Sequence, residues 1–304
     1  MTNRPTILLC FALGVCASAA AAPLAYVITG SQQFGEMDLA TGDFSPIGSI
    51  PATIQYVAPG PNGSLLTMSF NGDLDAINPA NGAISVVGNT GFADCSTPTT
   101  PTCGPNSQLS FGAFQGTLYA TDFANNIYTI DPVTGQATLL GATGIPAVPA
   151  IPVSTNPDGS FNFYDENLFG VGGKLYANFD AGSFNPSTFM FTVAVSPELY
   201  EIDVNTGQAT GIATTDFGLV TLANVNGTIY GFEGPTGQIV TLDVTNGSTN
   251  PISSPDPSLG LISGLAPTVP EPGSAALVLL GFFAAAARMR GTRRAHPSGA
   301  TNTQ

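Results

Sequence analysis

Short apolar stretches and glycine-containing turns recur with one phase along residues 23–268. One recurring unit is a strand ending in Asp or Asn, then Thr-Gly or Asn-Gly, then a second strand, a pattern typical of hairpins whose glycine takes positive φ. The turn glycines are Gly42, Gly82, Gly135, Gly207 and Gly247. Their spacings of 40, 53, 72 and 40 residues predict a unit of about 40 residues, with insertions in the longer gaps.

A second apolar strand precedes each of these turns. Copies begin at Leu24, Gly63, Gly116, Gly173 and Gly227. The later four follow a further strand, which begins at Ile54, Leu109, Asn167 or Leu219, whereas a lone strand of this kind, from Leu259, ends the region. Four short strands per unit predict an all-β fold, a five-bladed β-propeller in which residues 259–266 pair with the strands of residues 24–50. A β-sandwich also has short strands and glycine turns, but not this phased recurrence.

In blade layout the body resembles the WD-repeat and YVTN-type propellers, although it has no WD dipeptide. Because strands alternate in direction within a blade, loops after second and fourth strands emerge on one face of the disc. The three long insertions, Gly91–Ser107, Gly144–Asp165 and Ala181–Pro197, are all predicted there. We call this the looped face and the opposite one, with short turns, the trimmed face. Long loops on a rigid scaffold favour the looped face as the binding surface.

Acidic residues are expected to gather on the looped face. Asp122, Asp180 and Glu233 end the second strand in three consecutive blades. The binding-face candidates that accompany them are Asp94, Asp158, Asp165 and Glu166. Such a cluster could bind calcium, or serve as the acid and base of a carbohydrate-active hydrolase or lyase. Solvated loop charge is the alternative, and it is favoured, so no catalytic residue or cofactor is assigned and calcium stays open. The recurrent turn acids and amides, Asp38, Asn78, Asp131, Asp203 and Asp243, are expected to bind the backbone of their own turns.

Charge and composition exclude several classes of function. Residues 23–268 contain nineteen acidic residues and one base, Lys174, which gives a net charge near −18. Such a surface repels nucleic acid. The chain's one histidine, His296, lies near the C-terminus and there is no tryptophan, so a Ser-His-Asp triad or a histidine-ligated metal is excluded from the domain.

Both ends of the chain indicate export. Arg4, the apolar stretch from Ile7 to Val15 and the small residues up to Ala22 are typical of a signal peptide over residues 1–22. In an exported protein, Cys95 and Cys103, which flank a Pro/Thr-rich loop, predict a local disulfide. After the domain comes an apolar run of about 13 residues, 275–287, which is short for a membrane span and needs tilt or flanking residues to cross.

The C-terminal segment, residues 269–294, has three features in fixed order. They are the motif Val269, Pro270, Glu271 and Pro272, then the apolar run, then the basic residues Arg288, Arg290, Arg293 and Arg294. The order resembles the PEP-CTERM sorting signal of Gram-negative bacteria. The resemblance implies recognition by an exosortase, transient membrane insertion, and a place at the cell surface or in an exopolysaccharide or biofilm matrix. The polar extension, residues 295–304, departs from the family pattern and bears on how efficiently the signal is processed.

The sequence therefore predicts an exported, surface-directed binding or structural protein without catalytic activity. Its expected partners are the exosortase-type sorting machinery and a matrix glycan or surface protein. The alternative is a carbohydrate-active hydrolase or lyase that uses Asp122, Asp180 and Glu233. Calcium-dependent stability or adhesion is a third hypothesis, and it predicts a higher melting temperature when calcium is added.

Overall fold

The computed structural model describes residues 22–51, 54, 56–92, 108–145, 161–185, 190–216 and 218–268. Residues 1–21 of the predicted signal peptide, Asp94, Asp158, the Cys95 and Cys103 pair and the sorting segment from Val269 onward lie outside the described residues. Among the described residues, no helix is long and apolar enough to cross a membrane.

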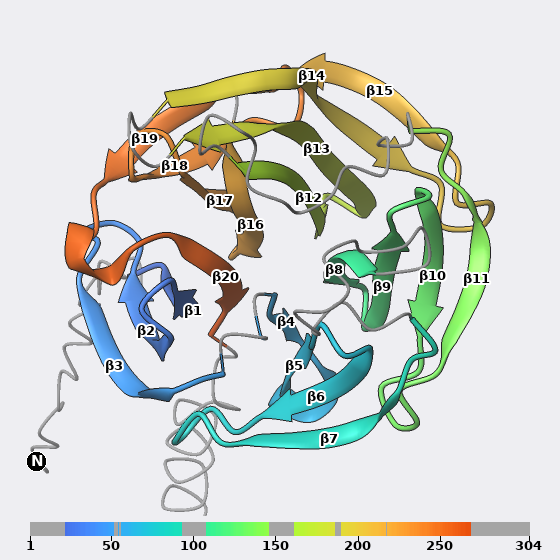
Figure 1. Ribbon diagram of the computed structural model, residues 1–304, viewed down its shortest axis with the longest axis horizontal. Coiled ribbons are helices and arrows are strands. Elements are labelled where there is room, and N and C mark those ends of the chain that lie inside the picture. The colour runs from blue at the N-terminus through green and yellow to red at the C-terminus, as the bar shows by residue number, and fades with distance from the viewer. Residues whose placement is uncertain are drawn as a thin grey trace, which may run out of the picture.

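Five four-stranded antiparallel sheets surround a common centre (Figure 1). Blade I contains, from the centre outward, β20 (Ile262–Pro267), β1 (Leu24–Thr29), β2 (Gln33–Asp38) and β3 (Phe44–Ser49). Blade II contains β4 (Ala58–Pro59), β5 (Leu65–Met68), β6 (Asp73–Ile77) and β7 (Ile84–Asn89). Blade III contains β8 (Gln108–Phe114), β9 (Thr117–Asp122), β10 (Asn126–Ile130) and β11 (Ala137–Ala142). Blade IV contains β12 (Phe161–Val171), β13 (Lys174–Asn185), β14 (Met190–Ile202) and β15 (Ala209–Thr214). Blade V contains β16 (Leu219–Val225), β17 (Thr228–Glu233), β18 (Gln238–Leu242) and β19 (Thr249–Ser253). The predicted five-bladed propeller is confirmed.

The ring closes within blade I, where the last strand pairs with the first. β20 lies antiparallel to β1, with Ala25 opposite Pro267 and Val27 opposite Leu265. The pairing ends at Thr268, whose backbone N–H and side-chain hydroxyl both donate to the Leu24 carbonyl, at 3.3 and 3.1 Å. The predicted pairing of the final segment with the first strands is therefore confirmed, and the innermost strand of blade I comes from the far end of the domain.

Each of the five interfaces between blades is filled by its own apolar cluster. Between blades I and II, for example, Phe34 packs with Leu65 and Ile77. The strand period of two sends alternate side chains to the two faces of a sheet, and here both faces meet a neighbouring blade. The strands are therefore more continuously apolar than strands with one solvated face.

The hairpin turns behave as predicted. In each of the five turns, a side-chain oxygen of the recurring Asp or Asn accepts the backbone N–H two residues on. The Ala40 N–H donates to Asp38 at 2.9 Å, and the Val133 N–H donates to Asp131 at 2.8 Å. The turn glycines have φ between 73° and 82°. Because positive φ is costly for residues with a Cβ, this backbone favours glycine.

The same turns connect each blade to the preceding one. The turn at Gly135 lies against Gly88 of β7. A Cβ added to Gly88 would be 2.0 Å from the Thr134 carbonyl oxygen of that turn. The turn at Gly207 lies against Gly141 of β11 in the same way, and a Cβ added to Gly141 would be 2.2 Å from the Thr206 carbonyl oxygen. A glycine in the outer strand thus permits close backbone contact with the next blade.

Two details differ from the sequence-based expectation. The predicted loop Ala181–Pro197 was wrong, because β13 continues to Asn185 and β14 starts again at Met190, with β12 pairing alongside from Phe161. Blade IV therefore extends beyond the other blades as a three-stranded antiparallel sheet. In blade II the predicted inner strand from Ile54 shortens to Ala58–Pro59, with one isolated bridge between Ile54 and Ser69.

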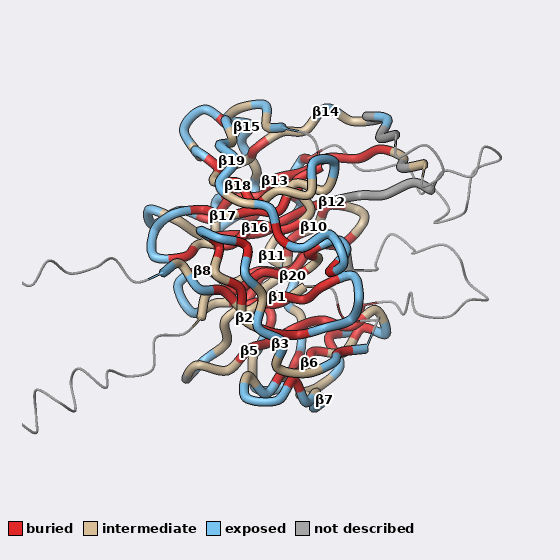
Figure 2. Tube along the Cα trace, turned by 90° about the vertical axis from the view of Figure 1, so that its left-hand side faces the viewer, coloured by how far each residue is buried: buried red, intermediate tan, exposed pale blue. Residues whose placement is uncertain are grey.

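The strand directions place the starting points of the insertions and the two ends of the domain on opposite faces. The described residues that flank the three insertions, at Phe92, Gln108, Ile145, Phe161 and the tip of the β13–β14 hairpin, all stand where second and fourth strands end. Leu24 and Thr268 stand at the other face, where first strands end. Figure 2 shows the disc edge-on, with the extended strands β12, β13 and β14 projecting to one side.

We predict that β20 is required for a stable fold and that the segment after it is not. Ending the domain at residue 258 removes the buried side chains of Ile262, Leu265 and Ala266 and opens the ring. The loss should exceed about 5 kcal/mol in the free energy of unfolding, since each large buried aliphatic contributes about 2–5 kcal/mol. Chemical denaturation of residues 23–258 and 23–268 measures it, and equal stability of the two would contradict the closure.

We also predict that Gly141→Ala lowers the free energy of unfolding by about 1–3 kcal/mol, because its Cβ collides with the Thr206 carbonyl and a backbone must shift. The matched control is Ala213→Gly, at the equivalent outer-strand position of blade IV, where a Cβ already fits; it should cost no more than about 1 kcal/mol. A Gly141→Ala variant as stable as the parent would show that this contact adapts freely.

Candidate functional site

The structure buries two of the three carboxylates predicted for the looped face. Asp122 ends β9 and Glu233 ends β17, as predicted, whereas Asp180 lies inside β13. Asp122 and Asp180 are fully buried, and Glu233 is half-buried. Glu233 accepts a hydrogen bond from the nearby Thr236 hydroxyl. The three carboxylates therefore lie in different environments.

Asp122 is satisfied within its own blade. It accepts hydrogen bonds from the backbone N–H and the carboxamide of Asn126, both at 2.9 Å, and from the Tyr128 hydroxyl at 2.8 Å. Burial, followed by this contact with Asp122, raises the pKa of Tyr128 to about 12. The phenol therefore stays protonated and donates. This network holds the β9–β10 turn together and leaves little of the carboxylate for a ligand.

Asp180 faces the interface between blades IV and V. One carboxylate oxygen accepts from the Gly218 backbone N–H at 2.7 Å, while Oδ1 has no hydrogen-bond partner among the described residues. Burial raises the pKa of this carboxyl to about 7, although the bond from Gly218 opposes the shift. Next to it on the same face of the strand, Asn178 accepts from the Thr215 hydroxyl at 2.8 Å. Asp180 is thus a buried acid that keeps its proton to a higher pH than an exposed aspartate does.

Glu166 was predicted on a loop but lies in the inner strand β12, buried, and faces blade III. Its Oε2 accepts from the Thr121 hydroxyl at 2.9 Å, which in turn lies 2.7 Å from the Ser110 hydroxyl. Its Oε1 has no hydrogen-bond partner among the described residues. Burial, reinforced by the charge of Asp122, raises the pKa of Glu166 to about 8, so the carboxyl is mostly neutral at pH 7.

These acids are not brought together as one site. Asp122 binds within blade III, Glu166 reaches blade III from blade IV, and Asp180 faces blade V. The backbone of Asp165 pairs with that of Asp180. In the described part of the chain, no three His, Cys, Asp or Glu side chains gather closely enough to hold a metal ion. The described residues therefore contain no shared carboxylate cluster of the kind that the calcium and acid–base hypotheses require.

A cavity of about 440 Å³ opens at the centre of the trimmed face. All five inner strands contribute to its wall, from Tyr56 in blade II to Leu265 in blade I. Because the inner strands run toward the trimmed face, Tyr56, Asn167 and Thr221 lie deep, whereas the exposed turn residues Gln115 and Asn226 lie at the mouth. Sequence reasoning placed the binding face on the other side and missed this site.

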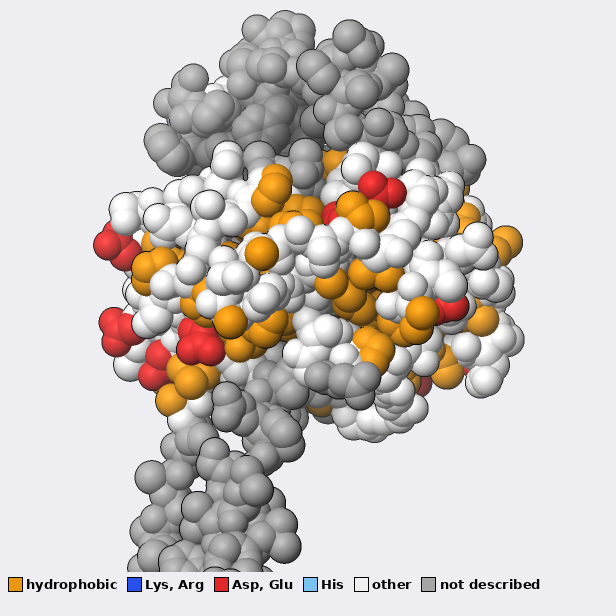
Figure 3. All heavy atoms as spheres, turned by 90° about the horizontal axis from the view of Figure 1, so that it is seen from below, with side chains coloured by type: hydrophobic (Ala, Val, Ile, Leu, Met, Phe, Trp, Pro, Cys, Tyr) orange, Lys and Arg blue, Asp and Glu red, His pale blue; other side chains and the backbone are white. Residues whose placement is uncertain are grey.

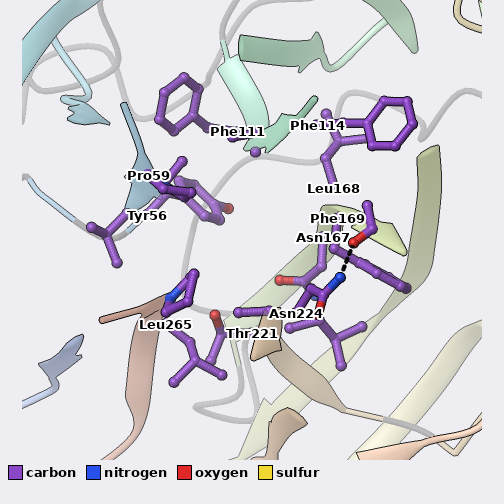
Figure 4. A pocket seen from close by; sticks show the side chains of 18 of the residues that line it. Tyr56, Pro59, Phe111, Phe114, Asn167, Leu168, Phe169, Thr221, Asn224 and Leu265 are labelled. Carbon is purple, nitrogen blue, oxygen red and sulfur yellow. Dashed lines mark hydrogen bonds between the residues drawn. The ribbon is translucent and has the colours of Figure 1, made fainter. Parts of the chain in front are cut away.

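The cavity is polar near its middle and apolar elsewhere. Figure 4 shows Tyr56, Asn167 and Thr221 around its middle, while the rings of Phe111 and Phe114 point outward into the blades. The Asn167 carboxamide nitrogen donates to the Leu219 carbonyl at 2.7 Å. No described Asp, Glu, Lys, Arg or His lines the cavity. The Asn and Thr residues in the recurring inner strands are the signal that could have indicated it.

The outer surface is acidic without matching bases. Lys174 pairs with Glu201 at 2.7 Å, the one salt bridge among the described residues. Figure 3 shows the disc from its edge, where isolated acidic side chains stand among uncharged and apolar ones and no basic side chain is seen. Charge therefore distinguishes the rim of the disc from the uncharged central cavity.

We predict that the protein is less stable at alkaline pH. The unfolded carboxyls titrate near 4.5 and 3.8, and the folded Glu166 and Asp180 near 8 and 7. Between these values the folded state binds more protons, so the free energy of unfolding falls as pH rises through about 8. Glu166→Gln should flatten the profile and exceed the parent in stability at pH 9 by at least about 1 kcal/mol. Denaturation at pH 5 to 9 measures this, and parallel profiles would refute it.

Comparison with known proteins shows no matching family model and no matching curated protein. Among solved structures, the chain is similar to one from a nidogen/laminin complex, with 11% identity over 81% of this chain and 98% of the other, at a TM-score of 0.44. A protein of unknown function from Bacteroides caccae is 13% identical over 81% and 98%, at 0.39. A PQQ-bound aldose sugar dehydrogenase from Streptomyces coelicolor is 12% identical over 73% and 87%, at 0.40. The propeller assignment rests on the strand pairing of this chain itself.

Proposed function

We propose that this chain is an exported binding or structural protein that acts without catalysis at the cell surface or in an exopolysaccharide or biofilm matrix. One observation carries the proposal: all three insertions leave a single face of a closed ring, opposite Leu24 and Thr268 at the two ends of the domain. A β-propeller is a rigid support of the kind that presents binding loops. The partner on the looped face is a matrix glycan or a surface protein, and nucleic acid is excluded by charge.

The proposed route to the surface uses both ends of the chain. Residues 1–22 direct export, and residues 269–294 insert transiently into the membrane and are handled by exosortase-type machinery. The position of Leu24 and Thr268 supports this arrangement, because they meet at the trimmed face. A chain held by its C-terminal segment would then direct the looped face away from the membrane.

The competing function is a carbohydrate-active hydrolase or lyase. One observation favours it: a buried carboxyl with a pKa near 7, such as Asp180, suits a general acid. Against it, Asp122 is fully engaged by Asn126 and Tyr128, and Asp180 faces a different interface from Glu166. The positions of these carboxyls therefore favour binding without catalysis.

We predict that residues 23–268 are retained on extracellular matrix from the producing cells, and that retention falls at least tenfold when residues 93–107, 146–160 and 186–189 are replaced by Gly-Ser sequence of equal length. The matched control, Val133→Ser, changes an exposed turn residue at the trimmed face and should bind normally. Sedimentation with purified matrix measures the retention.

Unchanged retention after all three replacements would contradict a looped-face partner. The same samples distinguish the enzyme alternative: new reducing ends released from matrix polysaccharide by the parent, and lost in Asp180→Asn, would replace binding by catalysis as the function.

A further inference from the structure

We propose that the central cavity of the trimmed face is a second binding site, for one or two units of an uncharged sugar. It is distinct from the looped-face surface of the proposed function and does not depend on that surface. Its volume of about 440 Å³ falls within the 300–1,000 Å³ of small-ligand sites. With this second site, the ring binds ligands at both ends of its axis.

The wall of the cavity is built to admit a ring-shaped ligand closely. Ala58, Gly112, Gly170 and Ala223 come from four different inner strands and line the space beside larger apolar residues such as Leu265. The large rings of the neighbouring residues Phe111 and Phe114 point outward and fill the blade interfaces instead (Figure 4). Gly112 and Gly170 let the inner strands of blades III and IV approach closely, since an added Cβ would be 2.1 Å from the Leu168 carbonyl oxygen and 2.3 Å from the Phe114 ring. The space is thus surrounded by tightly packed interfaces.

The polar groups converge from three blades. Tyr56, Asn167 and Thr221 lie around the middle of the cavity (Figure 4), from blades II, IV and V. Hydroxyl and carboxamide groups both donate and accept hydrogen bonds, which matches the hydroxyls of a sugar. The bond from Asn167 to the Leu219 carbonyl, at 2.7 Å, fixes the orientation of this carboxamide. Three separated polar contacts can select one ring orientation.

The mouth of the cavity is held in place as well. The Asn224 carboxamide donates to the Gly170 carbonyl at 2.6 Å and accepts from the Gly227 N–H at 2.8 Å, so it links blade V to blade IV. Inner strands bonded in this way lose little conformational freedom when a ligand enters. The site is thus preformed by the fold.

The absence of charged groups among the described lining residues decides the class of sugar. An acidic or an amino sugar would lose its hydration on entering the cavity and would meet no opposite charge in the wall. This desolvation is costly for a negative and for a positive charge. The net charge of the domain, near −18, adds long-range repulsion for acidic sugars. A neutral sugar meets neither penalty.

The test is calorimetric titration of residues 23–268, which contain the whole closed ring, with glucose, galactose, mannose and N-acetylglucosamine and their disaccharides. Glucuronic acid and glucosamine serve as charged counterparts. We expect at least one neutral sugar to bind, and its charged counterpart to bind at least tenfold more weakly. Thr221→Val and Tyr56→Phe each remove one hydroxyl and should weaken binding about threefold to tenfold.

Matched controls are Thr241→Val and Tyr230→Phe, which remove the same groups from half-buried positions outside the cavity. They should bind like the parent, and all four variants should melt cooperatively. The proposal is overturned if no neutral sugar binds the parent, if charged counterparts bind equally well, or if the cavity variants bind like their controls. Replacing the three insertions should leave sugar binding intact, so matrix retention and sugar binding can fail separately.

Discussion

The pairing of β20 with β1 is the interaction on which the rest of this molecule depends. It gives blade I its innermost strand and leaves no gap in the central ring of strands. An open inner edge would expose unpaired backbone groups and the apolar faces of two blades. With the ring closed, all five interfaces are covered, and the two faces of the disc become different surfaces. The insertions start from one face, and the other bears Leu24, Thr268 and the cavity.

Burial on both sides of every sheet also governs the polar residues. A side chain in an inner strand points into one of the two interfaces that its blade shares with its neighbours, and successive residues alternate between them. Glu166 and Asn167 illustrate this: the acid enters the interface with blade III, and the amide donates to the Leu219 carbonyl of blade V beside the cavity. One step along the strand therefore separates a strongly perturbed carboxyl from the uncharged lining of the cavity. The acids contribute sensitivity to pH, and the cavity keeps no charge.

The repeated turns both close a hairpin and contact the preceding blade. Each side-chain-capped turn fixes its own hairpin, and its glycine then lies against the outer strand of the preceding blade. Blade IV keeps this contact although its strands run far beyond the disc, which shows that the extension is added at the looped face without altering the trimmed one.

The sequence by itself determined the repeat, the hairpin turns, the number of blades and the strand that closes the ring, because turn chemistry and the strand period are local properties. It also placed Asp122 and Glu233 at strand ends. What only the tertiary structure decided is the environment of each side chain. Burial of Glu166 and Asp180 depends on which blade packs against them, and the cavity exists only where five inner strands, distant in sequence, meet. Local patterns carry no information on such meetings, so the acids that the sequence presented as a surface cluster are divided among separate interfaces.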